Sequence, residues 1–199
     1  MKLLKGVIAM VAATILSNGA FAAEKSIVIY FSHTGENYAV GVIKEGNTAK
    51  VAKEIARQTK ADIWEIKETE PYPVKYDDCI NLAKKELQAK ARPAFQGTAP
   101  DLAAYDTIYL GYPNWWGSAP MVVYTLLDKA KADGKRILPF CTHEGSGLGS
   151  TASKLAKAYP NAKIEQKGLA IRGATAQKDA TAVQKAVTEW LKSFGIKGE

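Results

Sequence analysis

The chain has 199 residues, with 27 Lys and Arg against 20 Asp and Glu and a net charge of +7. Its basic residues are scattered over several segments and no nucleic-acid-binding motif is visible, so the charge argues against a nucleic-acid partner. The sequence shows no repeat, low-complexity segment or shift in composition, and its length fits one globular domain.

The first 22 residues have the features of a secretory signal peptide. Lys2 and Lys5 precede an apolar run from Gly6 to Leu16, and Ala20-Phe21-Ala22 forms an Ala-x-Ala cleavage signal. Because the apolar run is too short to span a bilayer, we expect cleavage after Ala22. The mature domain is then residues 23–199, exported to the periplasm, with membrane contact only through the signal peptide during export. The alternative is an uncleaved N-terminal anchor.

The rest of the chain alternates between predicted strands and predicted helices. Strands are expected at 26–31, 62–67, 106–112, 136–141 and about 163–171, and helices at 48–60, 76–91, 119–131, 150–158 and 178–194. The first strand is an unbroken apolar run, as in strands that helices cover on both faces, whereas residues 62–67 alternate as in an edge strand. The pattern predicts an α/β fold with a five-stranded parallel sheet between two helical layers.

A hydroxyl-rich turn links the first strand to the first helix. Ser32-His33-Thr34-Gly35 follow the strand, and Asn47-Thr48 stand at the head of the helix. Hydroxyl groups beside the N–H groups and positive dipole end of a helix can bind a phosphate. The alternative is that Asn47 or Thr48 only caps its own helix. The motifs of P-loop and dinucleotide-binding proteins do not follow this strand.

Two further loops follow the third and fourth predicted strands. The first, Tyr112-Pro113-Asn114-Trp115-Trp116-Gly117-Ser118, offers two large aromatic rings, which either flank a planar ligand or pack against the domain's own helices. The second, Cys141-Thr142-His143-Glu144-Gly145-Ser146-Gly147-Leu148-Gly149, is rich in glycine and lets the backbone approach a ligand closely. We interpret His143 as a hydrogen-bonding residue of the pocket wall more readily than as an acid or base.

Together these three motifs resemble those of the flavodoxin family, in its branch with a Pro-Asn-Trp-Trp loop. The resemblance covers residues 25–195 and implies a three-layer flavodoxin-like sandwich, strand order 2-1-3-4-5, and one FMN bound without a covalent bond. It also implies three sets of cofactor-binding residues: Ser32, Thr34, Gly35, Asn47 and Thr48 at the phosphate; Pro113, Asn114, Trp115, Trp116 and Gly117 at one side of the flavin ring; and Thr142, His143, Gly145, Ser146 and Gly147 at the other. No catalytic or metal-ligating residue is assigned.

One departure from the family pattern concerns the phosphate loop. Residues 36–46 split Ser-x-Thr-Gly from Asn-Thr, so the phosphate ligands come either from Thr34 and Gly35 or from Asn47 and Thr48. A loop of this length beside a site is usually functional. We expect Tyr38 or residues 40–43 to cover part of the flavin or to receive a partner; the alternative is a surface hairpin without a role.

The resemblance leaves the function class open. An electron carrier that docks to a redox protein or exchanges electrons with a quinone or quinol is one class, and an FMN-dependent NAD(P)H:quinone-type reductase is the other. Export favours the carrier, because NAD(P)H is scarce outside the cytoplasm. A third class is a binding protein that has lost its cofactor. Cys79 and Cys141 are an even pair that an oxidising compartment could bridge, but each also suits a buried free thiol.

Overall fold

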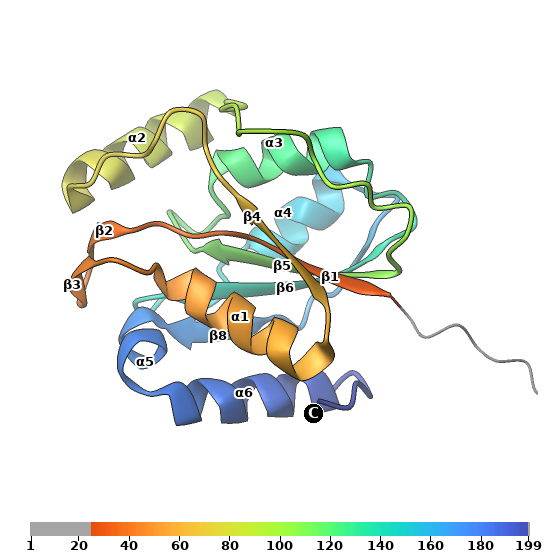
Figure 1. Ribbon diagram of the computed structural model, residues 1–199. Helices are drawn as coiled ribbons and strands as arrows, with labels where there is room; N and C mark the ends of the chain where they lie inside the picture. The colour runs from red at the N-terminus through yellow and green to blue at the C-terminus, as the bar shows by residue number, and fades with distance from the viewer. Residues whose placement is uncertain (1–24, 199) are drawn as a thin grey trace, which may run out of the picture.

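The computed structural model describes residues 25–198, and the predicted signal peptide lies outside them. Its main sheet is parallel and runs in the order β4 (Asp62–Ile66), β1 (Ser26–Phe31), β5 (Thr107–Pro113), β6 (Arg136–His143) and then β7 (Lys163–Ile164) and β8 (Leu169–Arg172), which both pair with β6 (Figure 1). With β7 and β8 sharing the last position, this is the predicted order 2-1-3-4-5. The order reverses between β1 and β5, which makes that boundary the switch point of the sheet.

Helices cover both faces of the sheet (Figure 1). One layer contains α1 (Asn47–Thr59), α5 (Gly173–Lys178) and α6 (Ala180–Lys192); the other contains α2 (Tyr76–Ala89), α3 (Met121–Ala130) and α4 (Thr151–Ala158). Alternate residues of β1 enter the two cores, with Ile29 facing α3 and Val28 facing α1. Because both faces of β1 are covered, its sequence is apolar without alternation.

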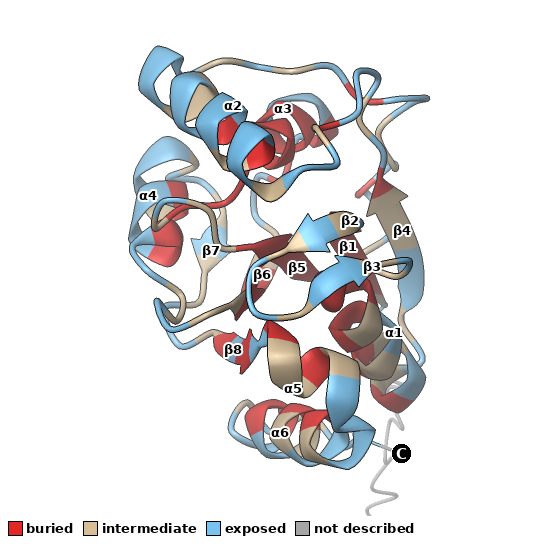
Figure 2. Ribbon diagram, turned by 90° about the vertical axis from the view of Figure 1, so that its left-hand side faces the viewer, coloured by how far each residue is buried: buried red, intermediate tan, exposed pale blue. Residues whose placement is uncertain are grey.

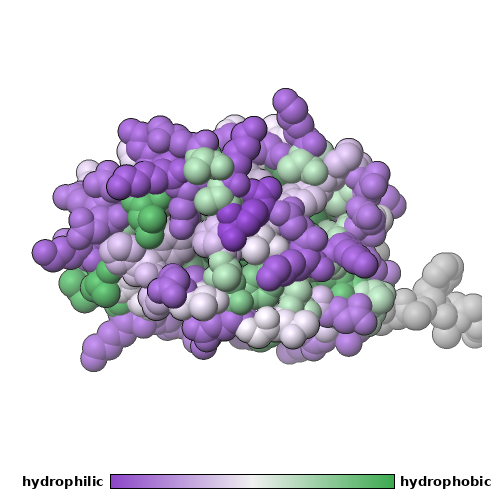
Figure 3. All heavy atoms as spheres, turned by 90° about the horizontal axis from the view of Figure 1, so that it is seen from above, coloured by the Kyte–Doolittle hydropathy of each residue, from purple (hydrophilic) through white to green (hydrophobic). Residues whose placement is uncertain are grey.

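Burial separates the central strands from the edge. Every residue of β5 is buried, whereas Asp62 and Ile63 of β4 are exposed, which confirms the predicted edge position of residues 62–67 (Figure 2). Viewed over α2 and α3, the outer surface is mainly hydrophilic with small apolar groups (Figure 3). The two helices differ, because α2 is amphipathic and buries only Cys79 and Ala83, whereas α3 is buried over most of its length and exposes only Asp128 and Lys129.

The fifth predicted strand differs from the structure, because it is divided into β7 and β8. Ile137 pairs with Ile164, and Phe140 pairs with Leu169. The chain therefore advances five residues between β7 and β8 while β6 advances three. Pro139 lies at the break. The Ile137 carbonyl accepts a hydrogen bond from Glu165 N–H, so the backbone polar groups of Ile137 point toward β7. Because backbone groups alternate in direction along a strand, those of Pro139 point to the same side of β6. Proline has no N–H to continue the ladder there, so the partner strand separates.

Two other segments refine the predicted elements. The predicted helix 178–194 is α6, and the short helix α5, which was not predicted, comes directly before it. Asp179 separates the two helices, and its carboxylate caps α6 by accepting from Ala182 N–H at 2.9 Å. The insertion at 36–46 forms an antiparallel hairpin of β2 (Gly35–Asn37) and β3 (Gly41–Ile43). This hairpin extends from the carboxyl end of β1 (Figures 1 and 2). Among residues 25–198, no helix combines the length and apolarity needed to cross a bilayer.

The two cysteines are free and buried, so the disulfide considered above is not formed. Burial raises the pKa of both the Cys79 and Cys141 thiols to about 12, which leaves neither as a reactive thiolate at neutral pH. We expect a disulfide-exchange reagent to leave both thiols unmodified in the folded protein and to modify both in denaturant. Counting labelled thiols by mass spectrometry checks this, and rapid labelling of the native protein would contradict it.

Candidate functional site

A pocket of about 320 Å³ opens at the carboxyl ends of β1, β5 and β6. This edge of a parallel sheet, next to the switch point, is where ligands bind in open α/β folds. Figure 2 looks onto it, with the β2–β3 hairpin in front. The lining comes from the hairpin, the first residues of α1 and α2, and the loops after β5 and β6: Asn37, Tyr38, Asn47, Tyr76, Pro113, Asn114, Trp115, Thr142, His143, Glu144, Gly145 and Ser146.

The inner end of the pocket is the start of α1. The Ala49 backbone N–H donates a 3.0 Å hydrogen bond to Ser32 Oγ, so the turn after β1 is held against the first turn of the helix. A Cβ on Gly46 would lie 2.2 Å from Ser32 Oγ and 2.6 Å from the His33 carbonyl oxygen. Only glycine therefore allows this close approach. The result is a helix N-terminus beside hydroxyl groups, an arrangement suited to phosphate.

The side chains of Asn47 and Thr48 do not cap α1. Asn47 Oδ1 accepts from Gln177 Nε2 at 2.8 Å, and Thr48 Oγ1 lies 2.8 Å from Thr142 Oγ1 in a buried hydroxyl pair. The Ncap is Gly46, which has no side chain to accept a hydrogen bond. Asn47 thus connects the start of α1 to α5, and Thr48 connects it to the end of β6. These contacts hold the segments together at one side of the pocket.

Trp115 forms the aromatic wall. Its ring contacts Tyr72, Phe31 and His33 edge-on, with centroid separations of 5.0, 5.7 and 5.7 Å. The turn Trp115-Trp116-Gly117-Ser118 is closed by hydrogen bonds of 3.0 and 3.1 Å between Trp115 and Ser118. Both central residues of this turn have positive φ, as in type I′ turns, where glycine is favoured. Packing against the core fixes the Trp115 ring.

Trp116 points elsewhere. Its Nε1–H donates to the Ile80 carbonyl at 2.8 Å, and Lys84 Nζ lies 4.8 Å from its ring centroid, so the side chain rests on α2. Its side chain is 48% exposed, and Trp116 is not among the residues that line the pocket. The structure therefore brings Trp115 to the site and leaves Trp116 outside it, because consecutive residues of this tight turn project in different directions.

The loops after β5 and β6 are joined to each other. Asn114 Nδ2 donates to Ser146 Oγ at 3.1 Å and to the Gly147 carbonyl at 2.6 Å. The Gly117 carbonyl accepts from Ser150 N–H and Oγ–H, at 3.3 and 3.1 Å. A Cβ on Gly149 would lie 2.9 Å from Gly117 Cα, which explains glycine there. The two loops form one continuous rim.

His143 is neutral and has a fixed tautomer. Gly145 N–H donates to its Nδ1 at 2.9 Å, so the proton of the neutral ring is on Nε2. Burial, and secondarily the nearby Arg172, lowers the pKa of His143. The ring thus presents an N–H donor at neutral pH, which fits its interpretation as a hydrogen-bonding wall residue.

The hairpin closes the outer side. Glu36 N–H donates to the Val74 carbonyl at 2.9 Å, and Tyr76 N–H donates to Glu36 Oε2 at 3.0 Å, so the hairpin is attached to the start of α2. The rings of Tyr38 and Tyr76 lie 5.7 Å apart, with 38° between their planes, at the pocket. The pocket therefore has an indole on one side and a tyrosine pair on another, with a helix N-terminus at its inner end.

A family model described as flavodoxin matches residues 25–192. The chain belongs to the flavodoxin family. Its structure is similar to those of two candidate flavoproteins, from Bacteroides eggerthii (27% identity, TM-score 0.67, 87% of this chain and 99% of that one covered) and Bacteroides uniformis (29%, 0.68, 85% and 98%). It is also similar in fold to a Lactobacillus acidophilus flavoprotein solved in complex with FMN (24%, 0.61, 78% and 98%). No curated protein matches the chain significantly.

The hairpin separates the two segments that were predicted to bind the phosphate. Ser32, Asn47 and Thr48 meet at the start of α1, whereas Thr34 is exposed and Gly35 already belongs to β2. Gly35 has φ +87°, and a Cβ on it would lie 3.0 Å from Val74 atoms, so its glycine serves the docking of the hairpin. Gly117 and Gly147 lie in the rim as carbonyl acceptors.

Four residues of the lining were not among the predicted site residues: Asn37, Tyr38, Tyr76 and Glu144. The length of the insertion pointed to Tyr38, and Glu144 lies within the glycine-rich loop. Tyr76 opens a helix with no motif of its own, and only the attachment of the hairpin brings it to the pocket. Among residues 25–198, no cluster of three or more His, Cys, Asp or Glu could hold a metal ion.

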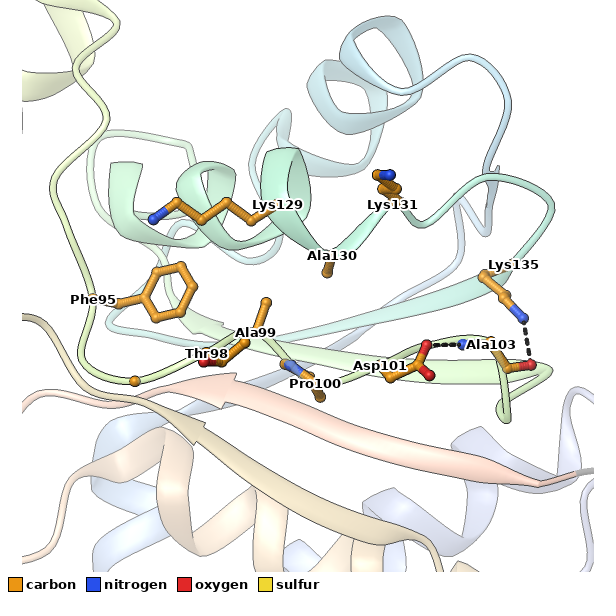
Figure 4. Close-up of a pocket in the computed structure, with 11 residues that line it drawn as sticks. Phe95, Thr98, Ala99, Pro100, Asp101, Ala103, Lys129, Ala130, Lys131 and Lys135 are labelled. Atoms are coloured by element: carbon orange, nitrogen blue, oxygen red, sulfur yellow. Dashed lines mark hydrogen bonds between the residues drawn. The ribbon is translucent and has the colours of Figure 1, made fainter.

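A larger cavity, of about 530 Å³, lies at the other end of this flavodoxin sheet, among residues that precede β5 and β6 (Figure 4). Several of its polar groups already have partners within the protein. Asp101 accepts from Ala103 N–H at 2.9 Å, Lys135 Nζ donates to the Tyr105 carbonyl at 2.7 Å, and Lys129 Nζ lies 4.9 Å from the Phe95 ring centroid. The smaller pocket at the strand carboxyl ends is the better candidate site.

Proposed function

We propose that this protein is an exported flavoprotein that binds FMN without a covalent bond and transfers electrons to or from a redox partner. The observation that carries the proposal is the convergence of a helix N-terminus, an indole wall and a glycine-rich loop on one pocket at the switch point. FMN has a phosphate, a polar chain and a planar ring, and each of these has a matching wall. Family membership supports the same cofactor.

The residues present fit that cofactor in three places. The start of α1 beside Ser32 would hold the phosphate. Trp115 would flank the ring, and the loop 142–147 would supply close backbone groups and the Nε2–H of His143. FMN, when bound, supplies the electron-transfer chemistry. The protein orients the ring, limits the access of water and tunes its potential through contacts at the ring edge.

The hairpin is proposed to cover the outer side of the ring. Replacing Tyr38 with alanine removes an aromatic side chain from the lining of the pocket, and a contact between two aromatic rings contributes about 0.5–1.5 kcal/mol. We expect Y38A to weaken FMN binding by roughly 5-fold, measured by isothermal titration of the apoprotein.

The matched control is Val42→Ala on the same hairpin, since Val42 is 78% exposed and does not line the pocket. V42A should leave the dissociation constant unchanged. If deleting residues 36–46 altered neither FMN affinity nor the rate of flavin reduction, the hairpin would have no role in cofactor binding.

Within this proposal, the carrier is favoured over an NAD(P)H:quinone-type reductase, because the predicted export places the protein away from NAD(P)H. Stopped-flow reduction of the FMN-loaded protein with NADH and NADPH separates the two. We expect reduction by either nucleotide to be slow compared with reduction by a redox protein or a quinol. Rapid, saturable reduction by one nucleotide would favour the reductase.

The export part of the proposal rests on the sequence of residues 1–22. N-terminal sequencing of the protein recovered from a periplasmic fraction is expected to begin at Ala23. A chain that begins at Met1 would contradict cleavage and favour an N-terminal anchor.

A further inference from the structure

The tip of the β2–β3 hairpin is apolar and exposed. Residues 37–43 carry no charge, and the residues between the two strands are Tyr38, Ala39 and Val40. Tyr38 is 61% exposed and Val42 is 78% exposed. Hairpin turns are usually built from glycine, asparagine, aspartate or serine, which suit both water and a tight backbone. An apolar tip is therefore unusual for a turn that faces only water.

The backbone of Ala39 makes the apolar tip more unusual. Ala39 has φ +63°, in the left-handed region. This conformation costs alanine more free energy than it costs glycine or asparagine. The tip thus keeps an apolar side chain where a polar one would fit the backbone better. Stability of the hairpin does not account for that choice, so it indicates a contact outside the chain.

The described part of the chain leaves this tip uncovered. Within residues 25–198, β2 and β3 form a sheet of their own that pairs with no other strand, and only the base of the hairpin, at Glu36, is bonded to the start of α2 (Figures 1 and 2). Six large apolar side chains are exposed in the same range, and Tyr38, Val42 and Val74 are three of them. Val74 packs against the base of the hairpin at Gly35. Exposed apolar groups that gather in one place mark contacts with proteins or membranes.

The charges around the tip favour an anionic surface. After cleavage at Ala22 the chain keeps a net charge of +5, because the first 22 residues hold two Lys and no acidic residue. Lys44 directly follows β3 and Lys75 directly follows Val74, and both are exposed. Basic groups beside an apolar segment are attracted to anionic lipid headgroups. The exposed residues Asp77 and Asp78 at the start of α2 offset part of this attraction, so we expect the apolar contact to contribute most.

The shape of the tip distinguishes a bilayer from a protein partner. The hairpin projects from the carboxyl edge of the sheet (Figure 1), so a protein would need a hollow that matches it. Lipid headgroups move aside for a projecting segment and require no such match. Tyrosine is enriched at the membrane–water interface, because its ring is apolar and its hydroxyl polar.

We propose that the hairpin tip, formed by Tyr38, Ala39, Val40 and Val42, inserts into the headgroup region of an anionic bilayer and docks the folded domain there. The contact is reversible and adds to the one expected of the signal peptide. Because Tyr38 also lines the pocket, docking brings the mouth of the pocket to the membrane surface, where a quinol partner would be found. The docking needs only the hairpin, so it does not depend on the FMN binding proposed above.

The test is sedimentation of the cleaved apoprotein with vesicles of phosphatidylglycerol and phosphatidylethanolamine in equal amounts. Cleavage removes the membrane affinity of residues 1–22, and we expect the wild-type domain to sediment with the vesicles. Val42→Asp places a charge in the tip and should weaken the binding by roughly 30-fold. The matched control is Ile63→Asp, because Ile63 is 45% exposed and lies near the amino end of β4, away from the hairpin. I63D should bind like wild type, with circular dichroism to confirm both folds.

Ala39→Asn separates docking from folding. Asparagine adopts the left-handed conformation more readily than alanine, so A39N should melt at or above the wild-type temperature. Its amide is polar, so we expect vesicle binding to weaken by roughly 5-fold. Lys44→Gln should weaken binding to the anionic vesicles by roughly 5-fold and leave binding to neutral phosphatidylcholine vesicles unchanged.

Three results would overturn the docking. The first is a wild-type domain that stays in the supernatant, which would leave the tip for a protein partner. The second is equal binding by wild type and V42D, or equal losses in V42D and I63D. The third is a dimer in light scattering that V42D separates into monomers, because a second copy would then cover the tip. None of these measurements uses flavin, so a failure of docking is distinguishable from a failure of FMN binding.

Discussion

Replacing Trp115 with alanine is expected to weaken FMN binding by roughly 30-fold or more. Stacking of a planar heterocycle on an aromatic side chain contributes about 1–3 kcal/mol by alanine substitution, and each 1.4 kcal/mol changes the dissociation constant about tenfold. Trp115 is the indole that lines the pocket, and its ring is held by Phe31 and Tyr72. Titration of folded apoprotein, with circular dichroism to confirm the fold, measures the effect.

The neighbouring tryptophan is the matched control. Trp116→Ala removes an indole of the same size from the same turn, but that indole lies on α2, bonded to the Ile80 carbonyl. We expect W116A to change FMN affinity by less than about twofold, since no ligand contact is lost. Equal losses in W115A and W116A, or a larger loss in W116A, would show that the ring binds on a different side of the loop.

Gly46→Ala should have the second large effect, and it acts at the opposite end of the pocket. Gly46 has φ −66° and ψ 151°, which alanine adopts without strain, so only its close contacts matter. The added Cβ would meet Ser32 Oγ at 2.2 Å and the His33 carbonyl at 2.6 Å and would force the turn and α1 apart. Such overpacking costs about 1–3 kcal/mol of stability. We expect FMN affinity to fall by roughly 100-fold, and riboflavin affinity to fall much less.

Gly97→Ala is the control for this substitution. A Cβ on Gly97 meets no atom within 4 Å, although its φ of +76° makes alanine strained by about 1 kcal/mol. G97A should therefore lower the melting temperature a little and leave both flavin affinities unchanged. If G46A lowered FMN and riboflavin affinity equally, the phosphate would not lie at the start of α1.

The sequence predicted the sheet well because its central strands are buried on both faces. Burial is visible in the sequence as apolar runs at 26–31 and 106–112 and as alternation at 62–67. The strand order followed from the family resemblance. The split of the last strand was missed, since it depends on which side of β6 Pro139 faces. That side is a property of register, and register is decided by pairing with other strands.

The site was predictable where one motif forms one wall. Three predicted walls meet at the pocket: the start of α1, Trp115 and the loop after β6. They meet because each follows the carboxyl end of a neighbouring parallel strand. Side-chain direction within a tight turn was not predictable, so Trp116 could not be separated from Trp115. Tyr76 joined the pocket only through the docking of the hairpin on the start of α2, a contact between segments 40 positions apart. Whether these residues bind the cofactor stays a prediction.

The most direct test of the whole account is the absorption spectrum of the apoprotein after incubation with FMN and removal of the unbound cofactor. The account predicts a yellow protein with the visible bands of oxidised flavin, perturbed by contact with Trp115 and carried at one flavin per chain. A protein that stays colourless after this treatment, while circular dichroism shows it folded, would contradict it.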